Sequence, residues 1–124
     1  MNTEDQLQSE IFKWYHNNYC LKNHKPRHCI FAVPNGGYRT KREAMKLKAT
    51  GVVAGVADLI IIQNNTTLFV ELKKPTGRQS KEQMQFEKTV TDLGLKYYLI
   101  RSLDEFKNIP EIKKLTKKPY LESL

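Results

Sequence analysis

The chain has 124 residues, of which 40% are hydrophobic and 27% are charged, so a single soluble globular domain is expected. No apolar run approaches the roughly 20 residues of a membrane span and the first residues are polar, which excludes a secretory signal and predicts a cytoplasmic protein. The 21 Lys+Arg residues against 13 Asp+Glu give a net charge of +8, which favours a polyanionic partner, with nucleic acid ahead of a membrane surface.

The first third of the chain predicts a helix followed by a short strand. A capping-box sequence and apolar residues at helical spacing predict a helix over residues 4–18. A polar, basic loop comes next, and residues 28–33 are expected to form a strand. The sequence Pro34-Asn35-Gly36-Gly37 then predicts a turn, because these residue types favour chain reversal.

The next segment predicts a basic helix and a loop. Good helix formers fill residues 40–50, and Gly51 provides a C-terminal stop. At helical spacing, basic side chains share one face of this helix and the turn before it: Arg39, Arg42 and Lys46. Residues 52–56 are small, apolar and flanked by glycine, so we expect a close-packed loop.

Two apolar segments around a pair of asparagines predict a β-hairpin. Residues 57–62 are expected to form a buried strand, because a continuous apolar run follows Asp58. Asn64 and Asn65 tolerate the positive φ angles of a tight two-residue turn. Residues 67–73 are then expected to form the antiparallel partner strand.

The remaining residues predict a helix, a strand and a short helix. Ser80 is expected to cap a helix that runs to about residue 93, with Gly94 as its terminator. Residues 96–100 form a strand, and residues 103–109 form a short helix that Pro110 interrupts. We expect residues 111–124 to be a basic C-terminal tail that is partly disordered. The fold class is therefore α/β, with a mixed central β-sheet flanked by helices, in one domain over residues 1–124.

Three charged residues on the predicted hairpin form a candidate active site. Glu71 and Lys73 alternate with Leu72 and so point to the same face of their strand. The turn centre lies about six residues from both Asp58 and Glu71, which places the two carboxylates close together. Carboxylates with the Leu72 carbonyl suit a hard cation such as Mg²⁺ or Mn²⁺, which can polarise a phosphate and lower the pKa of a bound water. Lys73 could hold that water or stabilise the transition state.

The alternative is an exposed edge strand on which Glu71 and Lys73 form a weak surface salt bridge. An isolated Glu-x-Lys sequence would favour that interpretation. Asp58 at the start of the neighbouring strand, the hairpin geometry and the positive net charge favour a metal-dependent site for phosphodiester hydrolysis instead.

The order and spacing of several motifs resemble a known family. Gly55-x-x-Asp58, Glu71-x-Lys73 and Ser80-x-x-Gln83, together with Glu10 and the turn at residues 34–37, resemble the VRR-NUC branch of the PD-(D/E)XK nucleases. The resemblance covers residues 10–101. Ala57 departs from the proline that gives the superfamily its name, although the adjacent Asp58 is the residue that binds metal.

This resemblance implies a restriction-endonuclease-like core and metal-dependent DNA cleavage. It assigns Asp58 and Glu71 as metal ligands and Lys73 as the catalytic lysine. It also implies that Glu10 supplies a further acid near the metal, acting through a water molecule, and that Gln83 orients Lys73 or the water. Small stand-alone members of bacteria and phages resemble junction-resolving enzymes, which implies a homodimer acting on branched, flapped or junction DNA.

Several residues are candidates for contacting DNA. The turn could bring backbone N–H groups to a phosphate, and basic side chains follow it at once. The alternative is that the glycines only turn the chain and that the charges only improve solubility. The predicted DNA-contacting residues are Asn35, Gly36, Gly37, Tyr38, Arg39, Arg42, Lys46, Lys74 and Arg78.

Two further questions stay open at this point. Ser80-Lys81-Glu82-Gln83 is itself a capping box, and a Gln83 side chain folded back onto the Ser80 N–H is not expected to reach Lys73 as well. A zinc-stabilised interaction domain is also an alternative, based on a cluster of potential ligands: His16, Cys20, His24, His28 and Cys29. A third alternative is a non-catalytic DNA-binding module on the same fold.

Overall fold

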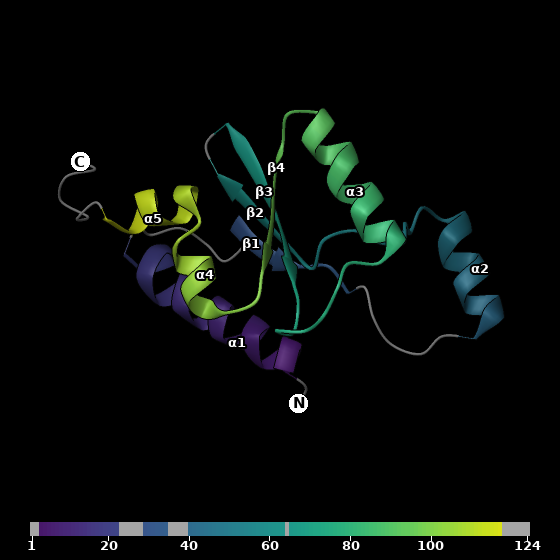
Figure 1. Cartoon of the computed structure of the whole chain (residues 1–124), viewed down its shortest axis with the longest axis horizontal. Helices are drawn as coiled ribbons and strands as arrows, with labels where there is room; N and C mark the ends of the chain where they lie inside the picture. Colours follow the sequence, from purple (N-terminus) through teal and green to yellow (C-terminus); the bar gives the residue numbers. More distant parts are fainter. Residues whose placement is uncertain (1–2, 23–28, 35–39, 64, 118–124) are drawn as a thin grey trace.

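The computed structural model of the chain describes residues 3–22, 29–34, 40–63 and 65–117 (Figure 1). The elements in chain order are α1 (Thr3–Tyr15), the π-helix η1 (His16–Cys20), β1 (Ile30–Ala32), α2 (Lys41–Ala49), β2 (Leu59–Gln63), β3 (Thr66–Leu72), α3 (Lys81–Asp92), β4 (Lys96–Ile100), α4 (Leu103–Lys107) and α5 (Pro110–Lys117). No helix in these ranges is long and apolar enough to cross a membrane.

The four strands form one mixed sheet in the order β1-β2-β3-β4. β2 pairs antiparallel with both β1 and β3, while β3 and β4 are parallel and are joined through α3. Gln63 pairs with Thr66, so the hairpin turn has the predicted two residues, and Asn65 takes a φ of 61°. Asparagine is suited to this position because it adopts a positive φ more readily than most other residues.

Helices cover both faces of this sheet. In Figure 1, α1, α4 and α5 lie on one side of the sheet and α3 lies on the other. The first side holds the core, in which alternate residues of β3 pack with α1 and α4: Leu7, Ile11, Tyr15, Leu68, Val70, Leu72 and Phe106. On the other side, the Phe86 ring of α3 meets the Phe69 ring of β3 edge to face, with centroids 5.3 Å apart.

The C-terminal segment differs from the prediction. Pro110 does not end the ordered chain; it is the first residue of α5, a position at which its missing N–H and fixed φ are tolerated. Ile109 and Ile112 are buried in the core, so residues 111–117 are helical because their apolar side chains find a place to pack. The predicted tail is therefore helical over residues 111–117, while residues 118–124 lie outside the described ranges and its partial disorder stays a prediction.

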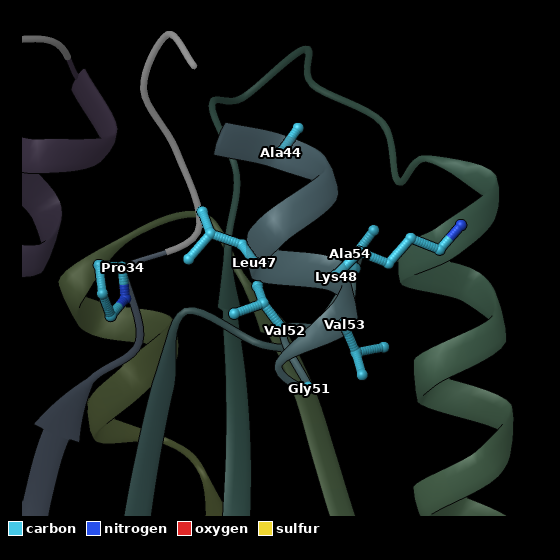
Figure 2. A pocket seen from close by; sticks show the side chains of 9 residues that line it. Pro34, Ala44, Leu47, Lys48, Gly51, Val52, Val53 and Ala54 are labelled. Carbon is cyan, nitrogen blue, oxygen red and sulfur yellow. The ribbon is translucent and has the colours of Figure 1, made fainter. Parts of the chain in front are cut away.

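The α2 segment packs loosely against the rest of the domain. None of its residues is buried, and only Leu47 is half-buried. A cavity of about 610 Å³ lies between α2 and the loop that follows it. Its lining residues, most of them labelled in Figure 2, are Pro34, Ala44, Leu47, Lys48, Gly51, Val52, Val53, Ala54 and Gly55. Because Val52 and Val53 are exposed, the prediction of a close-packed loop over residues 52–56 was wrong for its first half.

Candidate active site

Two carboxylates meet where β2 begins and β3 ends. Leu59 pairs with Val70, so the next position along the ladder sets Asp58 opposite Glu71. Oδ2 of Asp58 accepts a hydrogen bond from the Leu72 N–H (2.8 Å), which anchors the carboxylate to the neighbouring strand. Glu71 is only 1% exposed, and it is the single charged or polar residue among the described residues that is buried. The hairpin therefore brings both carboxylates together, as its sequence predicts.

Lys73 follows Glu71 on the same face of the sheet. Its Nζ lies 4.0 Å from Oε2 of Glu71, and its side chain is 14% exposed. The Lys73 N–H donates to the Ile100 carbonyl (3.0 Å), so the backbone at this position is held by β4. The Glu-Lys pair is thus inside the protein, and the alternative of an exposed surface salt bridge is wrong.

Gln83 connects this pair to the first turn of α3. Its Oε1 accepts from the Ser80 N–H (2.8 Å), and its own N–H donates to Oγ of Ser80 (3.1 Å), which completes a capping box. Its Nε2 donates to Oε2 of Glu71 (3.0 Å) at the same time. The two ends of one amide group therefore serve the helix cap and the site together, whereas the sequence suggested that capping would keep this side chain away from Lys73.

The surroundings of Glu71 favour its neutral form. Burial, followed by a hydrogen bond and charge interaction with Asp58, raises the pKa of Glu71 to about 9, although the nearby Lys73 acts in the opposite direction. Two neighbouring carboxylates are difficult to ionise together without a positive charge between them. A cation bound between Asp58 and Glu71 would remove this repulsion, and such strongly shifted groups are typical of functional sites.

The donor set fits a divalent cation. Oε1 of Glu71 is buried and accepts no hydrogen bond from the described residues, so when Glu71 gives up the proton that it can share with Asp58, this oxygen can bind a cation. No cluster of three or more His, Cys, Asp or Glu residues occurs in the described ranges. Two carboxylates are nevertheless sufficient for Mg²⁺, which usually keeps several waters and completes its shell with substrate phosphates.

Glu4, rather than Glu10, is the acidic residue of α1 that influences Glu71. Its charge contributes to raising the Glu71 pKa, whereas Glu10 is exposed. The helical period explains the difference, since Glu4 is two turns before the buried Ile11 and Glu10 is one residue before it, about 100° around the helix. The sequence contained this signal in the spacing of Glu4, Leu7 and Ile11.

The predicted DNA-contacting residues are only partly described. Residues 35–39 lie outside the described ranges. Arg42 and Lys46 are exposed on α2, which lies beyond the N-terminal end of α3 (Figure 1). Lys74 and Arg78 are exposed on the loop that leads from Lys73 to α3.

Three of the predicted zinc ligands lie in the described ranges: His16, Cys20 and Cys29. The Sγ atoms of Cys20 and Cys29 lie 3.7 Å apart, at hydrogen-bond distance. His24 and His28 fall outside the described ranges, and within those ranges no third ligand completes a metal-binding group.

Comparisons with known proteins agree with this architecture. The sequence model of the VRR-NUC domain matches residues 2–104. A solved structure described as a VRR_NUC domain protein superposes with a TM-score of 0.73 at 24% identity, over 94% of this chain and 90% of that chain. No curated protein matches the chain. The structural likeness confirms the predicted α/β fold with a mixed sheet between helices.

Proposed function

Because this chain belongs to the VRR-NUC domain family, we propose that it is a DNA endonuclease that hydrolyses phosphodiester bonds with Mg²⁺ or Mn²⁺. The observation that carries the proposal is the buried Glu71, which lies beside Asp58 and 4.0 Å from Lys73 and whose Oε1 accepts no hydrogen bond from the described residues. An ionised carboxylate is costly to bury unless its charge is paired, and a bound cation would add to the pairing that Lys73 and Gln83 provide.

Each residue of the site has a role that follows from its contacts. Asp58 and Glu71 would hold the cation, and the Leu72 carbonyl is a further proposed ligand. The bound cation would supply a Lewis acid for the phosphate and a water of lowered pKa. The Lys73 ammonium would stabilise negative charge that develops on the phosphate. Gln83 would orient Glu71 through its Nε2, and Glu10 stays a proposed acid that acts through water.

The proposed substrate is branched, flapped or junction DNA, and the proposed active form is a cytoplasmic homodimer with one site for each strand. Exposed basic side chains on α2 and on the loop before α3 support a polyanionic substrate. The proposed DNA contacts are Arg42, Lys46, Lys74 and Arg78, together with residues 35–39.

Removal of divalent metal tests the proposal. We expect labelled flapped and four-way DNA to be cut with Mg²⁺ or Mn²⁺, to be cut more slowly when linear, and to stay intact with a chelator. Affinity for DNA should fall steeply with salt both for a nuclease and for a non-catalytic DNA-binding module, since phosphate contacts release counterions. Binding without cleavage in any metal would instead identify a non-catalytic DNA-binding module. Zinc that copurifies and is lost in Cys20→Ala would identify the zinc-stabilised alternative.

Substitutions at the two ends of the capping box should separate the cap from the site. Ser80→Ala removes the Oγ that accepts from the Gln83 N–H but leaves the Gln83–Glu71 hydrogen bond. Gln83→Ala keeps that Oγ but removes the Oε1 acceptor of the Ser80 N–H together with the hydrogen bond to Glu71. The free energy of unfolding of each variant, measured by urea denaturation, should be about 1 kcal/mol lower than that of the wild type. Only Gln83→Ala should also slow cleavage, by about 10- to 100-fold, because it releases a residue that orients a metal ligand. Equal cleavage losses in the two variants would assign the whole effect to the cap.

A further inference from the structure

Arg101 holds the turn that connects Lys73 to α3. It directly follows β4, and its Nη1 donates to the carbonyls of Lys74 (2.6 Å) and Gly77 (2.8 Å), with the Pro75 carbonyl 3.4 Å away. The turn is closed by a hydrogen bond from the Gly77 N–H to the Lys74 carbonyl (3.0 Å). One guanidinium nitrogen of Arg101 therefore donates to several carbonyls of this turn and adds to the Gly77–Lys74 backbone hydrogen bond that closes it.

This turn lies directly against the side chain of Lys73. A Cβ added at Gly77 would be 3.5 Å from Cδ of Lys73, so the turn runs alongside the aliphatic part of the lysine with room for no more than a methyl group between them. The Lys73 N–H is already fixed by the Ile100 carbonyl, next to Arg101 in sequence. The lysine is thus held at its backbone by β4 and along its stem by a turn that Arg101 keeps in place.

We propose that Arg101 is a positioning residue, which acts through the Lys74–Gly77 turn to direct the Lys73 ammonium toward Glu71. This inference rests on the proposed role of Lys73 in phosphodiester hydrolysis. The same turn precedes Ser80, the N-cap of α3, so its conformation also sets where Gln83 begins its reach to Glu71. Arginine suits this position, because its planar, always charged donors match several carbonyls at once.

The competing role for an arginine near this site is a direct contact with a DNA phosphate. The two roles differ in what they change. Loss of a phosphate contact weakens binding and makes the dependence of affinity on salt shallower. Loss of a positioning residue slows the chemical step and leaves affinity and its salt dependence in place.

The experiment compares Arg101→Ala and Arg101→Lys with Lys88→Ala, which removes one positive charge from an exposed pair with Asp92 on α3. Single-turnover cleavage, DNA affinity over a salt series and melting temperature are measured for each variant. We expect Arg101→Ala to slow cleavage about 10- to 100-fold. Its DNA affinity and the salt dependence of that affinity should equal those of Lys88→Ala. Arg101→Lys should recover part of the cleavage rate. A weakened affinity with a shallower salt slope, or an unchanged cleavage rate, would overturn the proposal.

Hydrogen exchange provides a readout that does not depend on cleavage. Arg101→Ala should speed exchange of the Gly77 amide without changing that of the β2–β3 ladder, since only the turn loses its support. Should the wild-type protein cut no DNA, the proposed nuclease function fails, while this exchange measurement still decides whether Arg101 holds the turn. Unchanged exchange at Gly77 would contradict the positioning role by itself.

Discussion

Replacing Asp58 by asparagine is expected to lower the single-turnover rate of DNA cleavage by about 10³-fold or more. The asparagine oxygen can still accept the Leu72 N–H, so the fold is retained, but the negative charge beside Glu71 is lost. A metal ion contributes several kcal/mol to stabilising the transition state, and each 1.4 kcal/mol corresponds to about a factor of ten in rate. Cleavage of labelled flapped DNA with saturating Mg²⁺ measures the effect.

Asp92→Asn is the matched control, because Asp92 is an exposed carboxylate on α3 that pairs with Lys88 at the surface. It should cleave at the wild-type rate. A second readout is the rise in melting temperature on adding Mg²⁺, which reports binding to the native state. That rise should be present in the control and reduced in Asp58→Asn. An Asp58→Asn protein that cleaves within a few-fold of the wild type would exclude Asp58 as a metal ligand.

Gly55→Ala is expected to have the largest effect on stability, at about 2–5 kcal/mol. Gly55 has a φ of +87°, and an added Cβ would come within 2.3 Å of the Glu82 backbone carbonyl carbon in α3. The Glu82 carbonyl belongs to the backbone and cannot rotate away as a flexible side chain could, so either the loop or the helix must move. Because Gly55 is three residues before Asp58 and Glu82 is next to Gln83, cleavage should fall as well.

Gly51→Ala separates the two causes of this loss. Gly51 has a φ of +103°, but an added Cβ would have no atom within 4 Å, so this variant bears only the cost of the backbone angle. Urea denaturation of both variants should therefore give a clearly larger loss at Gly55. Equal losses would mean that the approach of the loop to α3 does not matter for stability.

The hairpin could be predicted from sequence because its geometry is local. A two-residue turn fixes the register of the strands, and the register alone sets Asp58 opposite Glu71, with Lys73 two residues farther along the same face. The resemblance to the VRR-NUC family rested on these positions and on Gly55 and Gln83. The mixed sheet followed in the same way from the alternation of apolar segments and turns.

The features that were missed depend on packing between distant segments. The Gln83 amide reaches Glu71 only because α3 crosses the sheet at that point, and no spacing rule gives that crossing. The α5 helix is stabilised by the burial of Ile112, which its short and lysine-rich sequence does not reveal. The contact of Arg101 with the Lys74–Gly77 turn spans more than 20 residues of sequence and joins two loops.

The loose attachment of α2 has a consequence for how such a protein can diversify. The helix contributes no buried residue, while the charged centre is supported by β2, β3, β4 and α3. Insertions or exchanges in residues 40–50 should therefore disturb little of the packing that supports the proposed active site. Selection could therefore change the proposed DNA-contacting surface on this helix without altering the residues of the proposed active site.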